Sequence, residues 1–156
     1  MDGILKYSIT IFRKTLCFLN TIKTQTQTKK QKKRATATIE LLTQENTHLI
    51  DAAIGNGPVD AIFKSINRIT NVSVGLTEYD VKAVTGGSDA IGEVNVRITE
   101  PVKRGDITFN GHGADPDILV ASAKAYISSI NKMLAFQKEV SGDKDWQETK
   151  KRKVGV

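Results

Sequence analysis

The stretch that decides the fold is AIGNGPVD, residues 53–60, where an apolar strand meets a Gly-x-Gly turn and a helix begins at Pro58. A related stretch, FNGHGADPD, follows at 109–117, and each stretch leads into a helix that contains Ser-Ile-Asn before a basic residue. The glycines of the two stretches lie 56 residues apart and the helix asparagines 64 apart, so the second helix is expected to be about two turns longer. The sequence therefore predicts a duplicated unit whose two helix N-termini form a paired binding site, not a catalytic centre.

Hydrophobic periodicity extends this unit in both directions. Residues 35–41 alternate between apolar side chains and Thr or Glu, which is typical of a half-buried strand. The helix from Pro58 has an apolar stripe through Ile69. The last helix is expected to open with Asp115 as its N-cap and to end near Phe136. Further strands are expected at 49–54, 76–84, 93–99 and 106–110.

The resulting order, β-β-α-β-β-β-α, predicts an α+β domain in which two helices pack on antiparallel sheet. Only two strands are recognisable before the first helix, whereas three precede the second. The first unit is therefore expected to lack one strand, at the position of a basic segment. We divide the chain into a low-complexity arm at 1–34, expected to be disordered, a folded domain at 35–137 and a charged tail at 138–156.

Positive charge is concentrated at the ends of the chain. The net charge is +6 overall, but residues 1–34 contain nine Lys or Arg and one Asp, while residues 35–149 contain ten basic and sixteen acidic residues. Nucleic-acid binding therefore stays an alternative only for the tails, as a nonspecific module that uses the arm. The stretch 24–34 lacks aromatic side chains that would stack on bases, which argues against specific recognition.

The residue types that build metal and redox sites are sparse. Cys17 is the only cysteine, and His48 and His112 are isolated from each other, so the sequence predicts no intramolecular disulfide, no metal site and no cofactor. No apolar run approaches the eighteen or so residues that a membrane span needs. We expect a reducing, cytoplasmic location, with an organellar stroma or matrix as the alternative if residues 1–34 are a targeting segment.

Three motifs in a fixed order identify a family. They are GNGPVDA at 55–61, the strand with Leu76 and Tyr79 that continues to AVTGGSDA at 83–90, and GHGADPDILVASAKAY at 111–126. Together they closely resemble the C-terminal regulatory domain of 2-isopropylmalate synthase, with citramalate synthase as a near relative. The resemblance covers roughly residues 35–136.

The resemblance implies two βββα units related by a pseudo-twofold axis, in a domain that forms homodimers and binds an end-product amino acid as a feedback inhibitor. The effector would be leucine, or isoleucine if the chain belongs to the citramalate branch. In these enzymes catalysis takes place in a separate (β/α)8 barrel that holds a metal with a His-x-His pair. A barrel needs about 250 residues and this chain has no His-x-His pair. The barrel domain is thus an expected partner, and this chain alone is expected to be inactive.

A free amino acid has a carboxylate, an ammonium group and an apolar side chain, and the positions that match the family can be assigned to each. The backbone N–H groups that suit the carboxylate lie around Gly55, Gly57, Gly111 and Gly113. Asp60 is the candidate for the ammonium group, whereas Asp89 fits a structural role better. The positions expected to line the pocket are Asn56, Val59, Leu76, Tyr79, Ala83, Ala90 and Ala114.

Each assignment has a structural alternative. The glycines can serve only the close packing of a strand on a helix, and the aspartates can cap a helix and a turn. The side chains of Val59, Leu76 and Tyr79 can simply belong to the core. The resemblance, and not the residue pattern by itself, favours a binding site at the 55–60 turn and at Tyr79.

Overall fold

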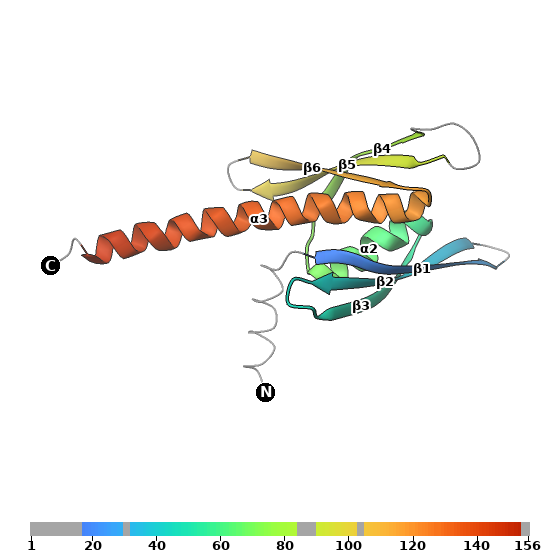
Figure 1. Cartoon of the computed structure of the whole chain (residues 1–156), viewed down its shortest axis with the longest axis horizontal. Helices are drawn as coiled ribbons and strands as arrows, with labels where there is room; N and C mark the ends of the chain where they lie inside the picture. The colour runs from blue at the N-terminus through green and yellow to red at the C-terminus, as the bar shows by residue number, and fades with distance from the viewer. Residues whose placement is uncertain (1–16, 30–31, 84–89, 103–104, 154–156) are drawn as a thin grey trace.

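The computed structural model describes residues 17–29, 32–83, 90–102 and 105–153, which form two three-stranded antiparallel sheets and two helices (Figure 1). The elements are β1 (Cys17–Lys29), β2 (Lys32–Thr43), β3 (His48–Gly55), α2 (Pro58–Thr70), β4 (Gly75–Ala83), β5 (Gly92–Val102), β6 (Gly105–Asp115) and α3 (Ile118–Lys153). The predicted α+β class is confirmed. The strands form two separate sheets, in the orders β1-β2-β3 and β4-β5-β6.

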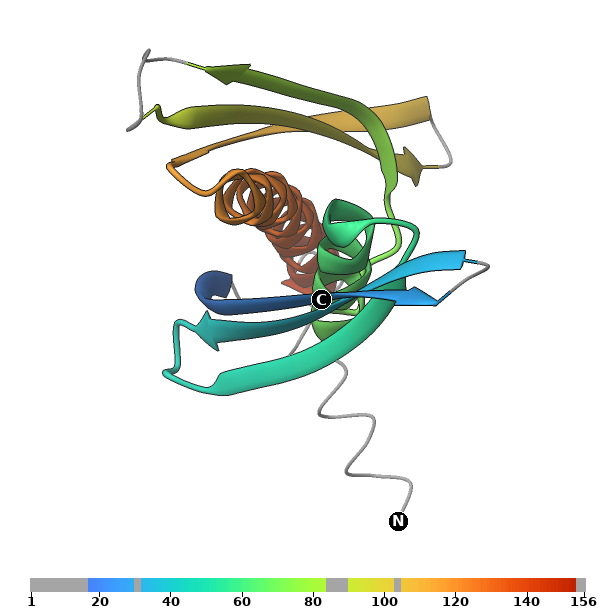
Figure 2. The same ribbon diagram turned by 90° about the vertical axis from the view of Figure 1, so that its right-hand side faces the viewer.

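The two helices lie side by side between the two sheets (Figure 2). Helix α2 packs on β2 and β3, whereas α3 packs on β5 and β6 and also contacts β1. Both central strands turn one apolar face toward the helices, as their alternating sequences predict. The largest fully buried side chains come from these four elements: Ile39, Leu41, Ile62, Ile66, Val94, Val96, Ile98, Tyr126, Ile130 and Met133.

Strand β1 is the strand that the sequence pattern did not reveal. It pairs with β2 along its whole length, and its register shifts between Leu19 and Thr21. The pairing of β4 with β5 shifts at the matching place, between Leu76 and Glu78. Because each of these first strands carries a bulge near its beginning, they are equivalent elements of the two repeats. The expectation that the first unit lacks a strand is therefore wrong.

The composition of β1 explains why the sequence predicts a disordered arm at these residues. Its Thr, Gln and Lys residues show no apolar alternation. An edge strand needs few apolar residues, since it pairs with only one neighbouring strand and only one of its faces packs on the core. Ile22 and Thr24 are the partly buried side chains within its described stretch. Residues 32–34 of the predicted arm begin β2, and residues 1–16 and 30–31 lie outside the described residues.

The structure aligns the two repeats with a different separation in the sequence from the one that the two Gly-x-Gly stretches indicate. Helices α2 and α3 begin at Pro58 and Ile118, and these starts are further apart in the sequence than the two Gly-x-Gly stretches are. When the helix starts are aligned, Gly55 corresponds to Asp115, and the second Gly-x-Gly lies within β6, before the turn. Helix α3 is longer than α2, as predicted, but it continues to Lys153 and not merely to Phe136.

The start of α3 also differs from the prediction. The Oδ1 atom of Asp117 accepts a hydrogen bond from the backbone N–H of Leu119 at 2.8 Å, so Asp117 is the N-cap. Asp115 caps the preceding turn, since its Oδ1 atom accepts the N–H of Asp117 at 3.0 Å. The ammonium group of Lys124, 2.6 Å from the Asp115 carboxylate, lowers the pKa of that carboxyl, and the Asp117 N–H lowers it further.

Candidate functional site

The turn between β3 and α2 is closed by a carboxylate of the chain itself. The Oδ2 atom of Asp60 accepts hydrogen bonds from the backbone N–H of Asn56 and from the ammonium group of Lys64, both at 2.8 Å. The Lys64 hydrogen bond is the main cause that lowers the pKa of Asp60, and the Asn56 N–H adds to it while partial burial opposes both. Asp60 is thus ionised at neutral pH and holds the turn before the helix.

A test of this turn follows from the sign of the pKa shift. Because the folded-state pKa of Asp60 is lowered, its ion pair stabilises the fold above the unfolded pKa of about 3.9 and is lost as the pH falls through the folded value. We expect Asp60→Asn to cost about 0.5 kcal/mol at pH 7 and almost nothing at pH 2.5. Urea unfolding of both proteins at the two pH values measures this. An equal cost at both values would contradict the ion pair.

The two glycines of this turn have different roles. A Cβ atom on Gly55 would lie 2.3 Å from the backbone nitrogen of Ala61, so only glycine lets β3 meet the first turn of α2. A Cβ atom on Gly57, the N-cap residue, would meet nothing within 4 Å. Its φ of −152° is extended backbone that any residue adopts. Gly57 therefore leaves open space beside the N-terminus of α2.

The glycines of the second stretch are packing residues in the described structure. A Cβ atom on Gly111 would lie 1.9 Å from the carbonyl oxygen of Ala125, and one on Gly113 would lie 2.3 Å from that of Ala121. Both are buried in β6 beneath α3, and β5 separates β6 from β4. Ala114 is exposed on the other face of the strand. The structure therefore does not bring these three predicted site residues to the α2 turn and β4.

Strand β4 carries the predicted pocket-lining residues on its inner face. Leu76 and Tyr79 pair with Ile98 and Val96, which are buried against the helices, so they share the inner face with them. They nevertheless remain 47% and 38% exposed, as does Val81 at 43%. Val81 was not predicted. The inner face of this edge strand is thus an apolar strip that the described chain leaves partly uncovered.

Two further predicted positions, Ala83 and Ala90, lie at the end of this strip, whereas Val59 is partly buried in α2 and packs against the core. Ala83 is exposed at the last residue of β4, opposite Gly92. Ala90 is partly buried shortly before β5. The connecting residues 84–89, including Asp89, lie outside the described residues.

An aromatic stack joins β4 to both helices. The ring of Phe63 in α2 meets the Tyr79 ring edge-on, with centroids 6.1 Å apart, and stacks on the Tyr126 ring of α3 at 4.1 Å. The Tyr126 hydroxyl donates to Asn67 of α2 at 2.8 Å. Burial raises the pKa of Tyr126 and the Asn67 hydrogen bond partly opposes this. Phe63 lies within the apolar stripe that the sequence predicts for the helix from Pro58, and Tyr126 is the last residue of the third motif.

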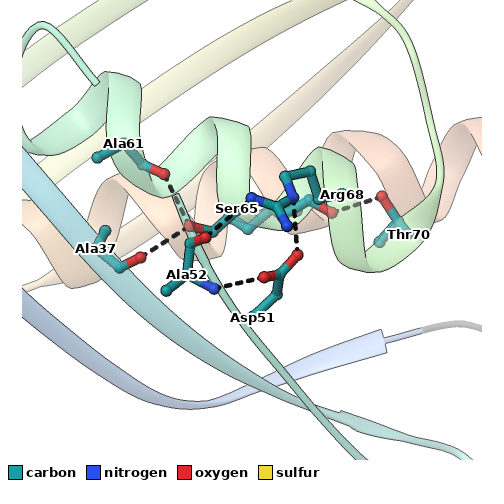
Figure 3. A network of polar contacts seen from close by, with 8 residues as sticks. Ala37, Asp51, Ala52, Ala61, Ser65, Arg68 and Thr70 are labelled. Atoms are coloured by element: carbon teal, nitrogen blue, oxygen red, sulfur yellow. Dashed lines mark hydrogen bonds and ion pairs between the residues drawn. The ribbon is translucent and has the colours of Figure 1, made fainter. Parts of the chain in front are cut away.

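A polar network holds α2 in place on its sheet (Figure 3). The Ser65 hydroxyl is buried and lies 2.9 Å from both the Ala37 and the Ala61 carbonyl oxygens. Arg68 contacts the Asp51 carboxylate at 3.0 Å and donates to the Ala52 carbonyl at 3.1 Å. These contacts hold the middle and the C-terminal turn of α2 against β2 and β3. By contrast, β4 is linked to the helices through the side chain of Tyr79.

Two kinds of feature are absent from the described residues. Among them, no group of three or more His, Cys, Asp or Glu side chains is placed to hold a metal ion. None of their helices is long and apolar enough to cross a membrane.

Comparison with known proteins places this geometry in a family. A model described as the LeuA allosteric (dimerisation) domain matches residues 9–134. The chain belongs to this family. The match takes in the whole of β1, in agreement with the structural equivalence of β1 and β4. The LeuA dimerisation domain in this chain is therefore more extensive than the motifs alone indicate.

The relatives of this LeuA dimerisation domain are longer proteins. It is 48% identical to the 2-isopropylmalate synthase of Gloeothece citriformis over 112 residues, which are 72% of this chain and 20% of that protein. It is 51% identical to the synthase of Picosynechococcus sp. over 109 residues, 69% of this chain and 20% of that one. For the synthase of Nostoc sp. the identity is 49% over 102 residues, 65% and 18%. The chain thus spans about a fifth of the length of these relatives and corresponds to their regulatory, dimerisation region.

Proposed function

We propose that this domain binds leucine as a feedback effector between the N-terminus of α2 and the inner face of β4, where a second copy of the chain completes the site. The observation that carries the proposal is the apolar strip of Leu76, Tyr79 and Val81. These side chains lie on the inner face of their sheet, yet the core of the described chain leaves them partly exposed. A branched aliphatic side chain is the group that such a strip would accept.

The α2 turn would hold the polar end of the ligand. The backbone N–H groups of Val59 and Asp60 fall in the first helical turn, where the helix itself offers no acceptor, and Gly57 leaves space for a carboxylate to approach. The Asp60 carboxylate already accepts two hydrogen bonds, and its further lone pairs remain for an ammonium group. In the longer relatives, a catalytic barrel domain would be the partner that receives the signal.

The direct test is thermal unfolding of the chain with and without amino acid. Leucine at about a hundredfold its dissociation constant is expected to stabilise the domain by about 2.7 kcal/mol, which shifts the unfolding midpoint by several degrees. Isoleucine tests the alternative effector, and D-leucine is the matched control for nonspecific effects. A folded, dimeric sample that shifts with neither leucine nor isoleucine would refute the proposal.

Gly57→Val gives the corresponding site variant. Its Cβ atom would meet nothing within 4 Å and its methyl groups would extend into the space at the N-terminus of α2, and extended backbone accommodates valine. We expect the unfolding midpoint without ligand to change little and the leucine-dependent shift to disappear. A variant that folds and keeps the full shift would place the ligand elsewhere.

A further inference from the structure

The two repeats differ chemically at one pair of equivalent positions. Tyr79 in β4 faces Val96, and Ile22 in β1 faces Ile39, so the two pairs occupy matching places after the bulges of their sheets. On the helices, alignment of the first residues of α2 and α3 makes Ser122 the counterpart of Ile62. The edge beside β4 thus carries two hydroxyl groups where the edge beside β1 carries two isoleucines.

The two hydroxyl groups form a directed hydrogen bond. The Oγ atom of Ser122 donates to the Ile118 carbonyl in the first turn of α3 at 2.6 Å. Its proton is therefore committed, so the Tyr79 hydroxyl is the donor in the 2.8 Å contact between the two side chains. This bond links the strand that bears the apolar strip to the start of the helix that covers the second sheet.

Tyr79 also contacts both helices. Its ring meets Phe63 of α2 edge-on while its hydroxyl is held by α3. More than a third of its surface stays exposed along the strip. A ligand on this strip would touch a ring whose far end is fixed to α3. The isoleucine pair of the other edge has no directional bond through which a displacement could be passed on.

We propose that the Tyr79–Ser122 hydrogen bond is the contact through which occupation of the β4 site alters α3, so that Tyr79 acts as a positioning residue for the regulatory response. This rests on the proposed binding of an amino acid at β4. When the ring is held by the ligand, its hydroxyl holds the first two turns of α3. Loss of the hydroxyl leaves the apolar ring wall in place but removes its attachment to the helix.

Amide hydrogen exchange of the whole chain, with and without saturating leucine, tests this. In the wild type we expect leucine to slow exchange both in β4 and at 118–126 of α3. In Ser122→Ala, whose side chain lies outside the proposed binding strip, we expect calorimetry to show a leucine dissociation constant within about threefold of wild type. Tyr79→Phe is compared with it at saturating leucine, so that a change in affinity does not affect the comparison. In both variants the slowing in β4 should persist, and that in α3 should fall at least about fivefold.

Ser129→Ala is the matched control. Ser129 is buried in the same helix and donates to the Tyr126 carbonyl, so its substitution also removes a buried hydroxyl that is bonded within α3. Its α3 response to leucine should equal that of the wild type. An undiminished α3 response in Tyr79→Phe would overturn the proposal while leaving the binding site intact. Wild-type protein that binds neither leucine nor isoleucine would refute the binding site, and this inference with it.

Discussion

Gly111→Ala is expected to cost more stability than any other single substitution considered for this domain. The added Cβ atom would lie 1.9 Å from the Ala125 carbonyl oxygen and 2.6 Å from the Ser129 nitrogen. Both are backbone atoms, so no side-chain rotation relieves the overlap and α3 must lift from β6. Because α3 supplies much of the shared core, we expect a loss of about 4 kcal/mol or more. That is a large part of the roughly 5–15 kcal/mol typical of a domain.

Chemical denaturation followed by circular dichroism measures this loss. Gly57→Ala is the matched control, because the same added atom meets nothing there and should change the free energy of unfolding by less than about 1 kcal/mol. If the two variants unfolded at the same urea concentration, the close approach of α3 to β6 would be wrong.

Removal of residues 1–31 is expected to abolish the folded domain. This deletion takes away β1, which pairs with β2 along its length and contacts α3. It would expose the backbone hydrogen-bonding groups of β2 and uncover the core side chains of its inner face, Ile39 and Leu41. A newly exposed edge with an apolar face favours aggregation. Size-exclusion chromatography should show aggregated protein, and urea unfolding should lose its cooperative transition.

Removal of residues 1–16 is the control for this deletion, since it leaves β1 complete. We expect a cooperative transition from this shorter protein. Two deletions with the same elution profile and the same unfolding midpoint would show that β1 contributes nothing to the fold.

The parts of the fold that the sequence predicted are those in which burial imposes a pattern. Strand β5 and helix α2 each turn one face to the core, so their apolar residues recur with periods of two and 3.6. The sequence does not predict strand β1, because this strand lies at a sheet edge and few of its side chains need to be apolar. The sequence does not predict the end of α3, because the apolar stripe of this helix ends well before its last residue.

The candidate site was predictable only in part, for a related reason. A glycine that leaves open space and a glycine that lets a helix approach closely look the same in the sequence, and only the three-dimensional structure distinguishes Gly57 from Gly111. Tyr79 and Leu76 lie on one strip of β4, and their role as pocket-lining residues stays a prediction. Ser122 could not be found from the pattern, because a small residue on a buried helix face is ordinary until its partner across the sequence is known.

The bulge shared by β1 and β4 makes the register of these edge strands independent of their composition. A slip of one residue would turn every side chain of a strand to its opposite face, and in most strands apolar alternation prevents this. Here an extra backbone residue at a fixed place anchors the pairing instead. Substitutions at the exposed positions of β1, such as Lys23 and Gln25, can therefore accumulate with little consequence. By contrast, a single insertion or deletion between Ile22 and the start of β2 would shift the pairing by one residue. It would turn Ile22 out to solvent and put a lysine or glutamine against the core.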